Sequence, residues 1–162
     1  MSYTLINHLD YNLWADTKLA ATIAQSDESI VNQETSSSFS TISKTILHII
    51  DAEFIWLRRL QGESLTYWPS QDFGGGREEL LKSYVAQAQT LKDYVIAQGN
   101  DYLSKTIEYK NMKGDIFSNT VEEILYHVIN HGTFHRGQLV TMLRANGFTE
   151  LSSTDLISYL RV

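Results

Sequence analysis

The feature that most constrains the fold is a long helical pattern that runs from about Asn119 to Ala145. Thr120 and Glu123 form a capping-box pattern at its start, and Asn146-Gly147 is a C-cap signal at its end. Apolar residues recur along it at helical spacing: Val121, Ile124, Leu125, Val128, Leu139, Met142 and Leu143. We therefore predict one amphipathic helix over this segment.

Three earlier segments show the same spacing of apolar residues and predict three more helices. They run from Leu5 to about Gln25, from about Thr41 to Gln61, and from Arg77 to Gln98. The polar segment Asn32–Ser40 separates the first two, and Gly62–Gly76, with a glycine triplet and the only proline, separates the next two. No predicted strand precedes these glycines and no nucleotide-binding pattern follows them, so we expect a surface crossover rather than a phosphate site.

The remaining segments predict smaller elements. Thr106–Ser118 has the pattern of a short β-hairpin, with Asn111-Met112-Lys113-Gly114 as its turn. Leu151–Val162 predicts one or two helical turns that begin near Thr154-Asp155. The expected fold is all-α, with the short hairpin before the last long helix and a short C-terminal helix. A chain of 162 residues suits a single domain, here residues 1–162.

Composition argues against several classes of protein. No segment approaches the roughly 20 uninterrupted apolar residues of a membrane span. The N-terminus also lacks the basic start and apolar run of a signal peptide, so we expect a cytoplasmic protein. The absence of cysteine excludes disulfides, thiolate zinc sites and a cysteine nucleophile. The net charge is −6 and there is no basic cluster, so nucleic-acid binding is not expected.

Three of the five histidines, His127, His131 and His135, lie four residues apart in the last long helix. At about 100° per residue, His135 lies within the apolar face, His131 at its edge, and His127 about 40° further towards the polar side. Residues four apart project over adjacent turns, so His131 and His135 can share one ion. His48, in the middle of the second helix, is the natural third ligand, because metal sites in bundles use side chains from facing helices.

A site of three histidines on a divalent ion leaves positions open for water or substrate, which is the arrangement associated with catalysis. Imidazole ligands suit zinc or nickel, with iron, manganese and copper as further candidates. The alternative reading is a set of hydrogen-bonded core histidines that bind no metal.

Four neighbouring residues have roles that the sequence leaves open. His127 is either a fourth ligand or, as its angle favours, a residue outside the ligand set. Asp51 either orients an imidazole or, as we expect, is a solvated helix residue. Gln138 either lines the pocket or satisfies a buried polar contact. Arg136 either reaches a substrate carboxylate or forms an ordinary salt bridge.

The order of motifs in the chain resembles that of the DinB-like (DinB/YfiT) family of four-helix-bundle metalloproteins. The motifs are Tyr11-Asn12-Leu13-Trp14-Ala15, then His48 with Asp51-Ala52-Glu53 and Trp56, then Asn130 to Gln138, and finally Asp155-Leu156-Ile157 with Tyr159-Leu160. They cover nearly the whole chain, and the third is the most specific. The resemblance implies a four-helix bundle with one long crossover and a metal bound by His48, His131 and His135. It also implies a homodimer, which is frequent in the family.

The resemblance implies a range of activities. Characterised relatives include thiol-dependent S-transferases and a mycothiol-dependent isomerase, and many other members are described as metal-dependent hydrolases without a known substrate. We therefore expect an enzyme in which the metal activates a low-molecular-weight thiol or water to attack a small-molecule substrate. Thiol S-transfer is slightly favoured over hydrolysis, by analogy with the family alone. The non-catalytic alternative is a metal-binding stress-response protein.

Overall fold

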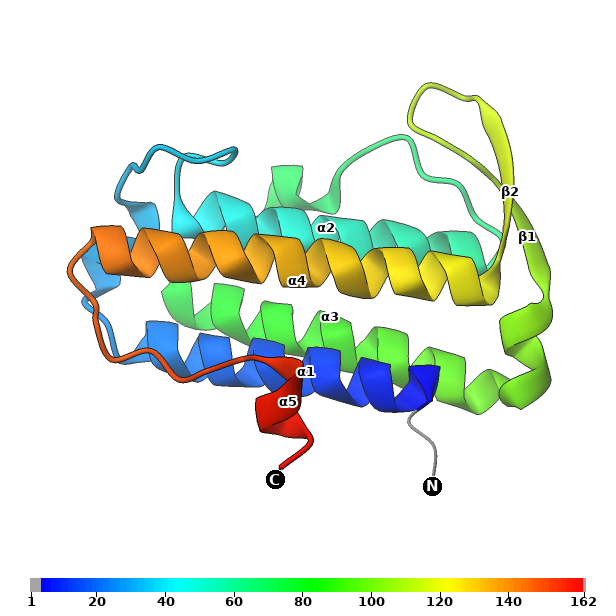
Figure 1. The fold of residues 1–162 in the computed structure, drawn as a ribbon. Helices are drawn as coiled ribbons and strands as arrows, with labels where there is room; N and C mark the ends of the chain where they lie inside the picture. The colour runs from blue at the N-terminus through cyan, green and yellow to red at the C-terminus, as the bar shows by residue number, and fades with distance from the viewer. Residues whose placement is uncertain (1–3, 162) are drawn as a thin grey trace.

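The structure is a computed structural model that describes residues 4–161, so residues 1–3 and Val162 lie outside the described part. The four long helices are α1 (Leu5–Ala24), α2 (Ile42–Leu60), α3 (Arg77–Gln98) and α4 (Val121–Ala145) (Figure 1). The smaller elements are the 3₁₀ helices η1 (Glu28–Asn32), η2 (Pro69–Asp72) and η3 (Asn100–Ser104), the antiparallel strands β1 (Thr106–Lys110) and β2 (Ile116–Thr120), and the one-turn helix α5 (Leu156–Tyr159). The predicted all-α class, the hairpin and the short C-terminal helix are confirmed.

Side-chain caps begin three of the long helices. Thr4 and Asn7 form a capping box at α1, and Thr41 caps α2. Thr120 and Glu123 form the predicted capping box at α4. These side chains satisfy backbone N–H groups that have no partner within the first helical turn, so the helix starts follow from local sequence.

The bundle consists of two parallel pairs of helices. Both α1 and α2 pack on α3 and on α4. In Figure 1, α1 runs in the same direction as α4, and α2 in the same direction as α3. Because α2 and α3 are parallel, the segment 61–76 must return along the bundle, and it is the expected long crossover. The antiparallel packing of α2 on α4 brings the middles of these two helices together.

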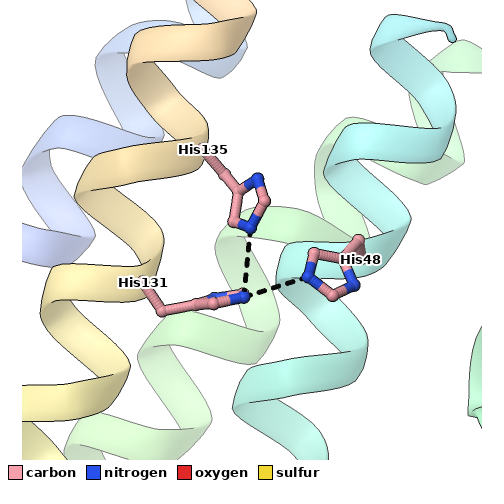
Figure 2. A group of neighbouring side chains, drawn as sticks. All are labelled: His48, His131 and His135. Atoms are coloured by element: carbon pink, nitrogen blue, oxygen red, sulfur yellow. Dashed lines mark hydrogen bonds between the residues drawn. The ribbon is translucent and has the colours of Figure 1, made fainter. Parts of the chain in front are cut away.

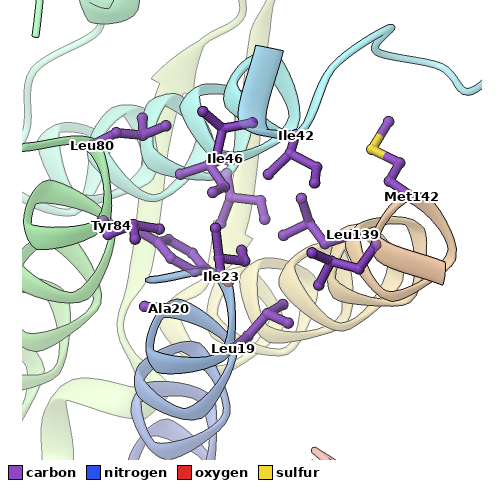
Figure 3. Close-up of a cluster of buried hydrophobic side chains, with 13 residues drawn as sticks. Leu19, Ala20, Ile23, Ile42, Ile46, Leu80, Tyr84, Leu139 and Met142 are labelled. Atoms are coloured by element: carbon purple, nitrogen blue, oxygen red, sulfur yellow. The ribbon is translucent and has the colours of Figure 1, made fainter. Parts of the chain in front are cut away.

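Apolar clusters fill both ends of the bundle. One cluster includes Leu19, Ile23, Ile42, Ile46, Leu80, Leu139 and Met142 (Figure 3). The other includes Leu5, Leu9, Leu57, Leu91, Val121, Leu125 and Ile129. Between residues 4 and 161, no helix combines the length and apolar character that a bilayer span requires.

A buried polar network lies between the two clusters and connects all four long helices. Arg136 donates to Asp16 at 2.8 Å and to Asn12 at 2.7 Å. Asn12 donates to Glu53 at 3.0 Å, and the Tyr84 hydroxyl donates to Asp16. Arg136 therefore forms a salt bridge, which is one of its two expected roles. It is only 2% exposed, so its charge is compensated inside the bundle rather than at the surface.

Candidate metal centre

Three histidine side chains meet where α2 packs on α4. His48 comes from α2, and His131 and His135 come from successive turns of α4 (Figure 2). The Nε2 atom of His131 lies 3.0 Å from Nε2 of His48 and 3.1 Å from Nε2 of His135. The structure thus brings together the three histidines that the sequence selected.

Hydrogen bonds among these three nitrogens cannot satisfy all of them. Each Nε2 of a neutral imidazole carries either one hydrogen or one lone pair, so Nε2 of His131 can bond to only one of its two neighbours. A shared cation would accept a lone pair from all three. Zinc–nitrogen bonds of about 2.0–2.1 Å place the nitrogens of a tetrahedral site about 3.3 Å apart, which is close to the two separations from Nε2 of His131. The donor set therefore fits a divalent metal ion.

Gln138 fixes the orientation of the His135 ring. Its Oε1 atom lies 2.7 Å from Nδ1 of His135, and an amide oxygen only accepts, so Nδ1 is the donor. The amide nitrogen of Gln138 donates in turn to Ser38 Oγ at 3.2 Å. With its hydrogen on Nδ1, neutral His135 presents a lone pair at Nε2 towards the other two histidines. Of the two expected roles, Gln138 therefore has that of satisfying a buried polar contact.

His48 and His131 are neutral near pH 7. Burial, followed by the neighbouring His135, lowers the pKa of both His48 and His131 to about 4. A neutral imidazole is the form that can bind a metal. His135 is buried, whereas His48 and His131 are partly exposed, so the site reaches the protein surface through these two rings.

A cavity of about 440 Å³ opens beside His48. It is lined by Phe39, Lys44, Leu47, His48, Asp51, Trp68 and Ser70. Phe39 stacks on the His48 ring with centroids 4.3 Å apart, and Trp68 lies 6.4 Å from the same ring. Phe39 was not among the predicted site residues. The one available signal was an aromatic residue isolated in the polar segment 32–40.

Asp51 holds the crossover against α2. Its carboxylate is buried and accepts hydrogen bonds from the backbone N–H of Ser70 at 2.8 Å and from the Ser70 hydroxyl at 2.5 Å. The expectation that Asp51 faces solvent was wrong, and in the described part of the chain its hydrogen bonds go to Ser70 rather than to an imidazole. The physical reason is that the crossover folds back over α2, and the sequence pattern does not show this contact.

His127 lies one turn of α4 before the triad. Its ring centroid is 6.1 Å from that of His131, and the ring makes an edge contact with Trp56 at 5.2 Å. The residue lies on the exposed side of α4, as its angle on the helical wheel predicted. His127 is therefore part of an aromatic cluster beside the triad, and it does not join the three histidines as a fourth ligand.

Comparisons with known proteins agree with this fold and this arrangement of motifs. The model of a family described as the DinB family matches residues 1–161. The chain is 29% identical over 161 residues to Protein DinB of Bacillus subtilis (strain 168), and the match covers 93% of this chain and 90% of that one.

Solved structures share the bundle. A DinB-like protein from Bacillus cereus is similar with a TM-score of 0.72 and 16% identity, over 92% of this chain and 95% of that one. YfiT from Bacillus subtilis is described as a probable metal-dependent hydrolase with an unusual four-helix bundle topology. It is similar with a TM-score of 0.68 and 10% identity, over 91% of this chain and 92% of that one. At these identities the likeness establishes the fold alone.

Proposed function

The chain belongs to the DinB family, and from this premise we propose that it is a metal-dependent enzyme whose ligands are His48, His131 and His135. The observation that carries the proposal is the convergence of three imidazole Nε2 atoms, separated by 3.0 and 3.1 Å, beside a cavity. Zinc or nickel is the proposed ion, and iron, manganese and copper are the alternatives.

We propose a low-molecular-weight thiol as the nucleophile and a small electrophile as its substrate. When bound, a divalent ion would lower the pKa of a coordinated thiol, whose proton would pass to solvent, whereas a hydrolase of the H-E-x-x-H type adds a glutamate as general base for its water. Between residues 4 and 161, no carboxylate joins the cluster of three imidazoles. Asp51, the acidic residue on the cavity wall, is occupied by its hydrogen bonds to Ser70. This arrangement favours the thiol.

The residues around the triad have separate roles in this proposal. Gln138 holds His135 in the tautomer that presents its Nε2 lone pair to the ion. Phe39 and Trp68 give the cavity two aromatic walls, which can bury the apolar part of a small electrophile and exclude water from it. The chain would therefore supply orientation and an apolar surface.

Hydrolysis is the second candidate function. The observation in its favour is the bundle shared with YfiT, which is described as a probable metal-dependent hydrolase. A non-catalytic metal-binding role in a stress response is the third, and in that case protein groups would occupy the remaining coordination positions.

Turnover of a generic electrophile distinguishes the three functions. Protein purified without a histidine tag is loaded with zinc or nickel and assayed with bacillithiol, glutathione and coenzyme A. We expect turnover that requires both metal and thiol, and His48→Ala should abolish it while the circular dichroism spectrum stays native. His8→Ala, which replaces a histidine of α1 outside the triad, is the control.

Ester or amide cleavage without activity towards any thiol would support the hydrolase. Stoichiometric metal without turnover, and a lowered melting temperature in His48→Ala, would support the non-catalytic role.

We also propose that the protein is a cytoplasmic homodimer that uses small-molecule substrates. The cytoplasm is where small thiols are kept reduced. Large apolar side chains are exposed on α4 and the hairpin, including Tyr126 at 45% and Phe134 at 63%, and exposed apolar surface often marks protein contacts. Sedimentation velocity should show a dimer that Phe134→Glu converts to a monomer. A wild-type monomer at micromolar concentration would overturn the proposal.

A further inference from the structure

Arg59, in the last turn of α2, is a buried cation. It is 7% exposed, and among residues 4–161 it forms no ion pair. Its Nε atom is also buried, and no described residue forms a hydrogen bond with it. Burial lowers the pKa of Arg59, which expresses the cost of removing a charge from water. A guanidinium carries five N–H donors in a planar fork, so Arg59 has the capacity to bind an oxyanion.

Two aromatic rings hold the guanidinium of Arg59. Its Cζ atom lies 4.4 Å from the ring centroid of Trp56 and 4.9 Å from that of Tyr109. These two rings contact each other with centroids 5.0 Å apart. The hydroxyl of Tyr109 donates to Asn119 at 2.9 Å, which fixes the ring on the hairpin. Contacts with the ring faces restrain the guanidinium while its N–H donors lie in the guanidinium plane, where an oxyanion would meet them.

The same aromatic cluster connects Arg59 to the histidine triad. Trp56 contacts His127 at 5.2 Å, and His127 lies 6.1 Å from His131. Arg59 and His127 both contact the Trp56 ring, with Cζ of Arg59 at 4.4 Å and the His127 ring centroid at 5.2 Å, so they belong to one aromatic cluster. Arg59 follows His48 by roughly three turns of α2, which is about 16 Å along the axis. A molecule that spans on the order of 15 Å or more can therefore reach both places.

We propose that Arg59, held by Trp56 and Tyr109, binds the carboxylate or phosphate group of an extended acidic thiol whose sulfur reacts at the histidine triad. The reaction at the sulfur rests on the proposed function. The oxyanion site itself rests on the contacts of Arg59. Both carboxylate and phosphate match the bidentate geometry of a guanidinium.

The neighbouring arginine provides a matched control. Arg58 is partly exposed, and it pairs with Glu63 and donates to Gln61 at 3.0 Å. Arg58→Gln therefore removes the same charge from the adjacent position on α2 without touching the aromatic cluster.

The test is a titration of metal-free protein with sodium phosphate and, separately, with sodium glutarate at constant ionic strength. The indole N–H resonance of Trp56, assigned with Trp56→Phe, reports binding. We expect wild type and Arg58→Gln to bind one of the two anions with equal affinity, and Arg59→Gln to bind it at least tenfold more weakly. The preferred anion shows whether the natural group is a phosphate or a carboxylate. Equal binding by Arg59→Gln and wild type, or no binding by wild type at millimolar anion, would overturn the inference.

A second variant keeps the test decisive if Arg59→Gln does not fold. Arg59→Lys retains the charge but loses the planar fork, so it should bind the preferred anion several-fold more weakly than wild type. Unchanged affinity in Arg59→Lys would count against the site as strongly as unchanged affinity in Arg59→Gln.

Kinetics of the metal-loaded protein connect the site to catalysis. With glutathione as the thiol, Arg59→Gln should raise KM at least tenfold and leave kcat unchanged, whereas KM for the uncharged glutathione diethyl ester should stay the same. Anion binding without any turnover would contradict the proposed function and leave the oxyanion site standing. Turnover with the same KM for glutathione in wild type and Arg59→Gln would contradict the inference alone.

Discussion

At the scale of single residues, one side-chain hydrogen bond decides how His135 presents its ring. Gln138 accepts from Nδ1 at 2.7 Å, so we expect Gln138→Leu to free the ring without removing a ligand. Loss of such a contact typically lowers metal affinity by about 10- to 100-fold. Competition with a chromogenic chelator measures this affinity. Gln89→Leu, the same substitution on α3, should leave the metal affinity unchanged. Equal metal affinities in the two variants would show that Gln138 does not support the metal site.

Two glycines of α4 test how closely the buried network fills the bundle. A Cβ atom at Gly132 would lie 3.1 Å from Oδ1 of Asn12 and 3.2 Å from a guanidinium nitrogen of Arg136, whereas one at Gly137 meets nothing within 4 Å. Asn12 and Arg136 are held by hydrogen bonds and cannot easily move, so Gly132→Ala should lower the free energy of unfolding by about 1–3 kcal/mol. Gly137→Ala should raise it by about 0.5–1 kcal/mol, because alanine is the better helix former.

Urea denaturation of the two alanine variants measures both effects under identical conditions. Equal changes in the free energy of unfolding would show that Gly132 is not required by the approach of Arg136. The pair therefore separates a steric requirement from the general cost of glycine in a helix.

At the scale of elements, the position of the crossover depends on Asp51. Both of its hydrogen bonds go to Ser70 in η2, so Asp51→Ala should release the segment 61–76 from α2. The loss of hydrogen bonds to a buried carboxylate should lower the free energy of unfolding by about 1–3 kcal/mol. Limited proteolysis should cut the variant faster within this segment. Metal affinity should stay within about twofold of wild type. A large loss of metal affinity would instead indicate that Asp51 supports the metal ligands.

At the scale of the whole molecule, the buried network makes stability depend on pH. Burial, followed by the nearby Asp16, raises the pKa of Glu53 to about 8 from an ordinary value of 4.5. The groups that face Glu53 are Asn12 and Asp16 of α1, Tyr84 of α3 and Arg136 of α4. Folded protein therefore keeps the proton of Glu53 in a pH range where the unfolded chain has already lost it.

The sign of the effect follows from linkage. A raised pKa contributes stability that is fully present below about pH 4.5 and is lost as the pH rises towards 8. Glu53→Gln is neutral throughout, so the free energy of unfolding of wild type should fall relative to this variant between pH 5 and pH 8. One pKa unit corresponds to about 1.4 kcal/mol, so the relative change should be on the order of a few kcal/mol.

Chemical denaturation at several pH values measures the free energy of unfolding, with Glu78→Gln at an exposed position as the control. Parallel pH profiles for wild type and Glu53→Gln would contradict the prediction.

The features that local geometry controls can be predicted from the amino-acid sequence. Helix starts at Thr4, Thr41 and Thr120 follow from side chains that cap the first turn, and apolar spacing predicts the four helices because a helix repeats every 3.6 residues. The same repeat places His131 and His135 on adjacent turns. The position of His48 in the middle of a facing helix predicted it as their partner, the motif resemblance implied the same residue, and these are the three rings that converge.

Which distant segments meet depends on the packing of the whole bundle. The hydrogen bonds of Asp51 to Ser70 and of Gln138 to Ser38, and the contact of Arg59 with Tyr109, join residues from different elements. They exist because α2 and α3 run parallel, which sends the crossover back over α2, because the segment before α2 reaches α4, and because the hairpin lies against the end of α2. Periodicity along a chain reports which face of a helix is apolar. Periodicity carries no information on which loop covers the polar face of a helix. In this protein, such loops contact α2 and α4 beside the three histidines.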